Sequence, residues 1–161
     1  MNTEVLNIEN PDTYEIIIGQ GNFSIKTIDD IYNAVFSSVP GVKFGAAMNE
    51  AKPKLTRVVG NDATLKDLAA KTCLKIGAGH VFVVYIKEAF PIHVLNAIKQ
   101  LPTVANVYVA TSNDLQVLVA TTDLGRSIIG VVDGSASNAI ETEEQRKERR
   151  DLVKKIGFMP D

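Results

Sequence analysis

The chain has 161 residues, of which 45% are hydrophobic and 22% charged, and its formal net charge is -2. A chain of this length can bury roughly 70% of its unfolded surface, so it needs neither a metal ion nor a disulfide to hold a core. The lack of a basic excess and of any Trp argues against a general nucleic-acid binder. We therefore expect one ordinary domain, residues 1–161, with no nucleic-acid partner.

Cysteine usage and the N-terminal residues bear on the compartment. Cys73 is the only cysteine, so no intramolecular disulfide can form, which fits a reducing cytoplasm. It stands at helical spacing from Leu65, Ala69 and Ile76, which favours a small buried hydrophobe over a nucleophile. No basic region precedes an apolar stretch at the N-terminus, and no run approaches the ~18 apolar residues of a membrane span. We expect a cytoplasmic protein without a membrane partner.

The first third of the chain predicts three strands and a helix. Residues 3–8 and 13–18 have strand composition and an Asn-Pro-Asp turn between them, which predicts a hairpin. Apolar residues then recur at helical spacing from Ile28 to Val39, and Pro40-Gly41 ends that helix. Residues 42–48 predict the next strand.

The middle of the chain alternates strands and helices. A short strand is expected at residues 55–59, and Asp62 is placed to cap a helix that ends at Gly77. Residues 80–86 are nearly all apolar, which is typical of a central strand covered on both faces. Pro91 suits the first position of a further helix.

Three strands and a charged helix complete the chain. The strands lie at residues 104–111, 115–122 and 127–132, and their short links make consecutive pairs antiparallel. Thr142 and Gln145 predict a capping box at the start of a solvated helix, which we expect Leu152, Val153 and Ile156 to hold. The order of elements predicts an α/β fold, with a mixed β-sheet, helices packed on it and an antiparallel meander near the C-terminus.

A group of cations precedes the second expected helix. Lys52 and Arg57 come before Gly60-Asn61-Asp62, where a flexible turn leads into a helix N-terminus. Free backbone N–H groups at such a terminus bind phosphate, and an arginine can add two hydrogen bonds. Alternatively, the Asp62 carboxylate itself satisfies the helix start and the cations are solvated on an edge strand. The residues alone leave both interpretations open.

Two other places could carry chemistry. His80 opens the central strand and could line a pocket at the edge of the sheet, or it could be a satisfied structural histidine. His93 lies in the first turn of the helix after Pro91, where a surface role is favoured. Asp133-Gly134-Ser135 ends the last strand with a turn and a short acidic group, which suits ribose binding, a metal or proton transfer, or is an ordinary turn. The histidines and the cysteine lack the spacing of a metal site.

Known nucleotide-binding motifs are missing. Gly19-Gln20-Gly21-Asn22 follows a strand and precedes a helix, but it lacks the third glycine of a dinucleotide fingerprint. A phosphate-binding G-x-x-x-x-G-K-[ST] loop and the motifs of protein kinases are also absent from the sequence. Phosphoryl transfer would therefore need a different architecture.

Several segments together resemble the adenosine-specific kinase family, which consists of small prokaryotic proteins of about this length. The matching segments occur in family order along the chain. They are Gly19-Gln20, Phe23, Lys26-Thr27-Ile28-Asp29-Asp30, Val42-Lys43-Phe44-Gly45, Glu50-Ala51, Leu55, Arg57, Gly60-Asn61-Asp62, Ile76-Gly77-Ala78-Gly79-His80, Ala89-Phe90-Pro91-Ile92, Val94-Leu95-Asn96-Ala97-Ile98-Lys99, Ile129-Gly130-Val131-Val132-Asp133-Gly134 and Lys155-Ile156-Gly157.

The resemblance implies an α/β fold, a homo-oligomer and a site for adenosine or AMP, with phosphoryl transfer from ATP. ATP and Mg²⁺ would then be the cofactors. The family's usual Glu-Ala-Ser-Gly is Glu50-Ala51-Lys52-Pro53 here, which changes the shape of that loop. Gly21-Asn22 also departs from the family pattern, which tends to carry a histidine just before the phenylalanine. Fold and ligand class therefore transfer better than chemistry.

Three functions follow as hypotheses. The first is an enzyme that binds adenosine or AMP, in which Lys52, Arg57 and the start of the helix at Gly60-Asn61-Asp62 face phosphate. Asp133, beside Gly134, would be the base or the magnesium ligand, and His80 would line the pocket. The second is a non-catalytic AMP-binding or sensor protein, which the missing ATP-phosphate loop favours. The third is a structural assembly protein without a ligand.

Overall fold

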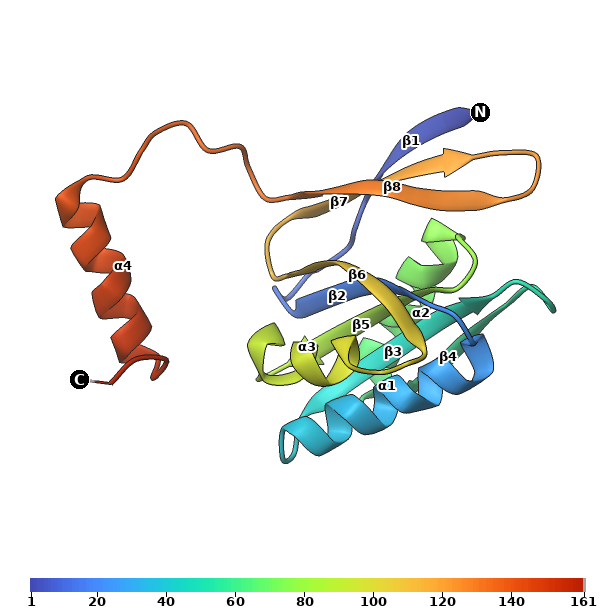
Figure 1. Cartoon of the computed structure of the whole chain (residues 1–161), viewed down its shortest axis with the longest axis horizontal. Coiled ribbons are helices and arrows are strands. Elements are labelled where there is room, and N and C mark those ends of the chain that lie inside the picture. Colours follow the sequence, from blue (N-terminus) through green and yellow to red (C-terminus); the bar gives the residue numbers. More distant parts are fainter. Residues whose placement is uncertain (161) are drawn as a thin grey trace.

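Two antiparallel sheets and four helices form the computed structural model, which describes residues 1–160 (Figure 1). The strands are β1 (Asn2–Asn7), β2 (Glu15–Gly21), β3 (Lys43–Glu50), β4 (Leu55–Gly60), β5 (Val81–Lys87), β6 (Val104–Thr111), β7 (Leu115–Thr121) and β8 (Arg126–Asp133). The helices are α1 (Ser24–Ser38), α2 (Ala63–Ile76), α3 (Pro91–Lys99) and α4 (Glu143–Lys155).

The larger sheet has the strand order β4-β3-β5-β2-β6 and supports both hydrophobic cores. Its central strand β5 is buried at every residue from Val81 to Ile86, as its uniformly apolar sequence predicted. Helix α2 packs on one face of this sheet, where Leu65 and Ile76 join the core. Helices α1 and α3 cover the other face, where Ile31 and Val94 are buried.

The smaller sheet has the order β1-β7-β8 and lies against the face of the larger sheet that also carries α2. Its inner side chains include Leu6, Val117 and Ile128, which share one core with Ile16 and Val83 of the larger sheet. No helix covers its outer face in the part of the chain that the structure describes (Figure 1).

The structure confirms the α/β class, the helices packed on sheet and the run of three strands near the C-terminus. These three strands are shared between the two sheets: β7 pairs with β8, whereas β6 pairs with β2. The expected hairpin of the first two strands is wrong, because β1 pairs with β7. Leu6 and Ile8 are buried beside Val117, and burial of these side chains selects this partner.

Local signals in the sequence located the helix ends correctly. The Asp62 carboxylate accepts a hydrogen bond from Leu65 N at 3.0 Å, and Gly77 ends α2 in the left-handed conformation at φ 68°. Cys73 is fully buried in α2, as expected, and burial raises the pKa of its thiol to about 12.

The expectation about the last helix is partly wrong. Thr142 and Gln145 form the predicted capping box, but α4 buries no residue. Leu152 and Ile156 are 57% and 48% exposed, so these side chains do not hold the helix against the rest of the chain. Figure 1 shows α4 apart from both sheets, at the end of an extended segment. None of the helices in residues 1–160 is long and apolar enough to cross a membrane.

Candidate functional site

The residues predicted from the sequence lie at two opposite ends of the larger sheet. The pairing of β3 with β4 places Glu50 opposite Leu55 at one end and Gly45 opposite Gly60 at the other. We call the first the hairpin end, because it contains the β3–β4 turn. Lys52, Arg57 and His80 lie toward the hairpin end. The start of α2 lies at the other end, which we call the cavity end.

At the hairpin end the protein supplies its own anion for the arginine. Arg57 Nε and Nη2 both contact Glu50 Oε2 at 2.6 Å, and the Glu50 side chain is only 12% exposed. Lys52 lies exposed in the turn. His80 is half-buried, and its backbone N–H donates to Asn49 O. The positive charge of Arg57 is therefore compensated within the chain.

The turn at Gly60-Asn61-Asp62 is also occupied by its own side chains. Asn61 Oδ1 accepts from Phe44 N at 3.0 Å, and Asn61 Nδ2 donates to Val42 O at 2.9 Å. The Asp62 carboxylate already accepts a hydrogen bond from the backbone N–H of Leu65 in the first turn of α2. These contacts fix β3 against the start of α2, which is the structural alternative that the sequence left open.

Asp133 sits at the end of β8 in a small polar cluster. Its Oδ1 accepts from Thr111 Oγ1 at 2.7 Å and from Asn113 Nδ2 at 3.1 Å. Gly134 follows in the left-handed conformation at φ 71°, and its N–H donates to Asp114 O. A hollow of about 450 Å³ beside this cluster is lined by Gly134 but not by Asp133.

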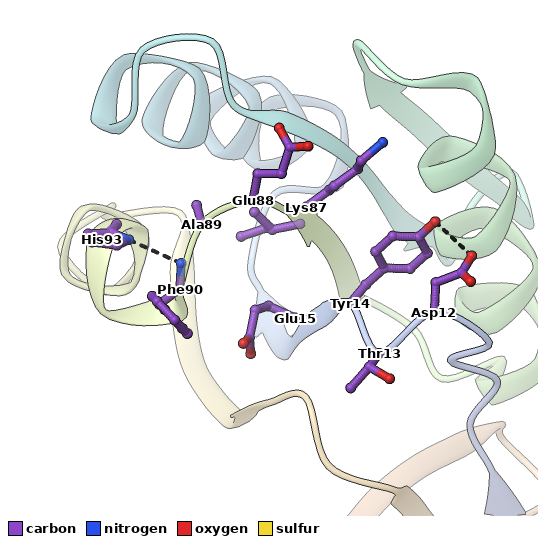
Figure 2. Close-up of a pocket in the computed structure, with 10 residues that line it drawn as sticks. Asp12, Thr13, Tyr14, Glu15, Lys87, Glu88, Ala89, Phe90 and His93 are labelled. Carbon is purple, nitrogen blue, oxygen red and sulfur yellow. Dashed lines mark hydrogen bonds between the residues drawn. The ribbon is translucent and has the colours of Figure 1, made fainter. Parts of the chain in front are cut away.

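A well-formed cavity lies at the cavity end. Its volume of about 710 Å³ is within the roughly 300–1,000 Å³ of small-molecule sites. The β1–β2 loop, the start of β2, the end of β5 and the start of α3 surround it (Figure 2). The residues that line it are Asp12, Thr13, Tyr14, Glu15, Ile86, Lys87, Glu88, Ala89, Phe90 and His93.

The cavity is acidic. Asp12, Glu15 and Glu88 provide three carboxylates, whereas Lys87 is its one cation. Figure 2 shows Glu15 between Phe90 on one side and Thr13 on the other. Burial raises the pKa of Glu15, and a hydrogen bond with Ser112 partly opposes this shift. The arrangement thus provides a carboxyl group whose pKa is shifted toward neutrality inside a cavity.

Two residues of the cavity wall have an unusual backbone conformation. Thr13 and Glu88 adopt φ angles of 56° and 62°, in the left-handed region that side chains rarely enter. The conformation is especially uncommon for a β-branched residue such as Thr13. Strained residues of this kind gather at functional sites, so their position on both sides of the cavity supports a binding role.

His93 and Phe90 form the wall that α3 contributes. The backbone N–H of Phe90 donates to His93 Nδ1 at 3.0 Å, so in the neutral ring the proton resides on Nε2. Phe90 is 45% exposed and presents an aromatic side chain to the cavity. The N-cap residue Phe90 has no side-chain acceptor for the first-turn N–H groups of α3, and Pro91 occupies that turn. The first turn of α3 therefore lacks the internal carboxylate found in α2.

The comparisons with known proteins identify the family. Residues 6–159 match the model of a family described as adenosine specific kinase. The chain belongs to this family. A solved structure, the crystal structure of PH1918 protein from Pyrococcus horikoshii OT3, is 61% identical over 99% of both chains, with a TM-score of 0.96. A comparison with curated proteins gives no match.

Membership of the adenosine specific kinase family supports a kinase function related to adenosine. Sequence reasoning missed most of the cavity. Phe90 stood out only as part of a family segment, and His93 only as a surface residue of its helix. Thr13 and Glu15 join Glu88 in one wall because β2 pairs with β5 at Glu15 and Ile86, and no local signal gives that register. Within residues 1–160, no group of three His, Cys, Asp or Glu side chains could hold a metal ion.

Proposed function

We propose that this protein binds adenosine in the cavity at the cavity end and transfers a phosphoryl group to it from ATP. The observation that carries the proposal is the acidic lining of this cavity. Adenosine is uncharged, and its ribose hydroxyls and amino group are hydrogen-bond donors that carboxylates accept. AMP is an anion, which the three carboxylates of this cavity repel. The cavity therefore suits adenosine as the substrate and favours release of AMP as the product.

Aromatic and apolar side chains provide a place for the adenine ring. Phe90 faces the cavity from α3, and Tyr14 and Ile86 line the β2 and β5 side. Stacking of a base on an aromatic side chain contributes about 1–3 kcal/mol. The polar groups lie beside these side chains, as in most ligand sites, where a few polar groups orient a ligand held by apolar contact.

Glu15 is the group that we assign to accept the proton of the ribose hydroxyl. Phosphoryl transfer needs a base within hydrogen-bond reach of the nucleophile, and a base with a raised pKa is better matched to neutral pH. Lys87 and the first turn of α3 can stabilise negative charge on the transferred group. These roles replace the ones predicted for Lys52, Arg57 and His80, which lie toward the opposite end of the sheet.

ATP would bring Mg²⁺, which proteins commonly hold through one or two carboxylates and the substrate phosphates. Asp133 fits this need better than the role of a base. Its Oδ1 takes two side-chain hydrogen bonds, whereas its Oδ2 takes none among the described residues. The carboxylate is exposed and close to the β6–β7 turn that contains Ser112, the hydrogen-bond partner of Glu15.

The second candidate is a non-catalytic AMP-binding protein whose site lies at the hairpin end. Lys52 and Lys54 are exposed there, and His80 has a strained φ of 61°. Such a site would use these cations as the sequence suggested, without the Gly60-Asn61-Asp62 turn, which lies at the cavity end. The Glu50–Arg57 ion pair and the cap by Asp62 are the observations that make it the weaker candidate.

Titration calorimetry with adenosine and with AMP distinguishes the two sites. We expect adenosine to bind more tightly than AMP, and Phe90→Ala to weaken adenosine binding at least tenfold through lost stacking. Phe36→Ala is the matched control, because this exposed aromatic residue lies on α1 and outside the cavity. Arg57→Ala should leave adenosine affinity unchanged. Loss of binding in Arg57→Ala with normal binding in Phe90→Ala would assign the ligand to the hairpin end.

Incubation with adenosine and ATP labelled at the γ-phosphate tests the transfer. We expect label in AMP, and we expect Glu15→Gln to lower turnover and to flatten the acid limb of the pH–rate profile while adenosine still binds. Adenosine binding without label in AMP for the native chain would support a purely binding role.

A further inference from the structure

The segment that follows α4 contacts the wall of the cavity through an aromatic side chain. None of the residues of α4 is buried, so the helix itself has no packed face. Phe158, shortly after its end, is 40% exposed, and its ring lies against the start of α3. Figure 1 shows the end of α4 on the side of the molecule where α3 begins. The C-terminal segment thus reaches the wall of the cavity through a ring contact and not through a buried face of α4.

The backbone at the end of α4 determines where the Phe158 side chain leaves the helix. Gly157 has a left-handed φ of 88°, and its N–H donates to Lys154 O at 2.9 Å. The N–H of Phe158 donates to Val153 O at 3.1 Å. Together these two bonds form the Schellman motif, in which a glycine ends a helix and reverses the chain. A Cβ at Gly157 would meet nothing within 4 Å, so this glycine is needed for its backbone conformation and not for packing.

Phe158 contacts both aromatic residues that α3 contributes to the cavity wall. Its ring centroid lies 5.6 Å from that of Phe90, with an interplanar angle of 68°, and 5.8 Å from that of His93. The rings of Phe90 and His93 are themselves 6.0 Å apart, and Figure 2 shows these two residues side by side at the start of α3. Edge-to-face pairs at such distances are favourable, so the three rings form one cluster.

The position of Phe158 leaves the cavity open. Phe90 and His93 line the cavity, whereas Phe158 does not. Its contact therefore holds Phe90 from outside and leaves the cavity surface of that ring free for a ligand. An exposed aromatic side chain that must become ordered on binding lowers affinity by about two- to tenfold, and a neighbour that orders the ring beforehand removes this cost. Phe90 is 45% exposed, and Phe158 is such a neighbour.

We propose that Phe158 is a positioning residue of the adenosine site, which holds the Phe90 ring in the orientation that stacks on adenine and does not itself touch the ligand. The inference rests on the proposed binding of adenosine in this cavity. It makes the C-terminal segment part of the binding site, although no residue of α4 lines the cavity. Adenosine affinity then depends on the ring of Phe158 and on the turn at Gly157 that places it.

Titration calorimetry and steady-state kinetics of the full chain test this role. We expect Phe158→Ala to raise the dissociation constant of adenosine about three- to tenfold. The KM for adenosine should rise by the same factor while kcat stays unchanged, because the stacked ring acts equally in the ground state and the transition state. Phe158→Tyr keeps the ring and should restore affinity. Gly157→Ala keeps Phe158 but strains its turn, so it should weaken binding by a smaller factor.

A matched control separates this role from a general effect of removing an exposed ring. Phe36 is 54% exposed and its ring stacks on that of Tyr32 at 5.8 Å, but it lies on α1 and outside the cavity. Phe36→Ala should leave adenosine affinity unchanged. The melting temperature of Phe158→Ala should equal that of the native chain, because α4 buries no residue. Weaker binding at unchanged stability is the result that a merely structural anchor would not give.

Fluorescence tests whether the ring stays in place when adenosine binds. The chain has no Trp, so Phe158→Trp introduces a single indole at this position. We expect its emission maximum to stay constant when adenosine saturates the site, and to move to longer wavelength when Phe90→Ala removes the ring that it packs against. A shift to longer wavelength on adding adenosine would show that the ligand displaces the ring, which overturns the proposal.

The binding data distinguish failure of this inference from failure of the proposed function. Normal adenosine affinity in Phe158→Ala, with affinity lost in Phe90→Ala, overturns the positioning role alone. Tighter binding in Phe158→Ala also overturns it, because the ring would then compete with the ligand. Normal affinity in both variants, or a native chain that binds no adenosine, overturns the proposed function together with this inference.

Discussion

The two ends of the larger sheet differ in whether the chain itself neutralises their charged side chains. At the hairpin end, Arg57 stands in a basic stretch of the sequence, yet Glu50 neutralises it at 2.6 Å. At the cavity end, Asp12 and Glu15 come from one stretch and Glu88 from another, and within residues 1–160 none of them forms an ion pair. A cluster of charge in a sequence therefore does not identify a site, because strand pairing decides which charges are already compensated.

The largest effect that we expect concerns the packing that fixes the cavity end. A Cβ added at Gly45 would lie 2.2 Å from the backbone of Leu65 and Lys66, so β3 and α2 would have to separate. We expect Gly45→Ala to cost about 3 kcal/mol or more, which lowers the melting temperature by roughly 6–12 °C. Gly125→Ala is the control, since nothing lies within 4 Å of its Cβ position. Equal melting temperatures for Gly45→Ala and Gly125→Ala would show that β3 and α2 pack less closely than these distances require.

At the hairpin end, the Glu50–Arg57 pair should contribute to stability rather than to ligand binding. Glu50→Ala leaves a half-buried guanidinium without its partner, and we expect unfolding in urea to show a loss of about 2 kcal/mol. Lys52→Ala should change stability by less than about 0.5 kcal/mol, because Lys52 is exposed. Loss of adenosine binding in Glu50→Ala, with stability unchanged, would reverse the roles that we give to the two ends.

A smaller effect is expected from the cap of α2. Asp62→Ala removes the acceptor for Leu65 N, and the loss should be about 1 kcal/mol in the free energy of unfolding. Asp62→Ser should restore most of it, because serine caps helices equally well. Both variants should bind adenosine normally in calorimetry. A large loss of affinity in Asp62→Ser would mean that this carboxylate contacts the ligand.

The smallest effect concerns the ionisation of Glu15. Burial raises its pKa in the folded state above the ordinary value of 4.5, so the folded protein holds this proton more tightly than the unfolded chain. Its contribution to stability is therefore present below pH 4.5 and is lost as pH rises through the folded pKa. Glu15→Gln cannot ionise, so it avoids this loss of stability. We therefore expect the variant to be more stable than the native chain only at pH values above the folded-state pKa of Glu15. Urea unfolding at several pH values measures the difference.

Local signals predicted the elements well because they act over a few residues. The apolar run of β5, the Asp62 cap and the capping box at Thr142 all involve neighbours in the chain, and each is confirmed. The prediction of a β1–β2 hairpin was wrong because strand composition does not specify which strand pairs with which. In the structure β1 pairs with a strand more than 100 residues away. The apolar stripe of α4 was correctly located, but its periodicity could not show that the chain itself would leave it uncovered.

The sequence by itself determined the α/β class, the helix ends, the buried cysteine and the family to which the chain belongs. Those features depend on periodicity, on short-range hydrogen bonds and on an ordered set of segments. Only the tertiary structure decided which charges meet and where a cavity forms. Glu50 meets Arg57, and Glu15 faces Phe90, because the register of long-range strand pairs brings distant segments together.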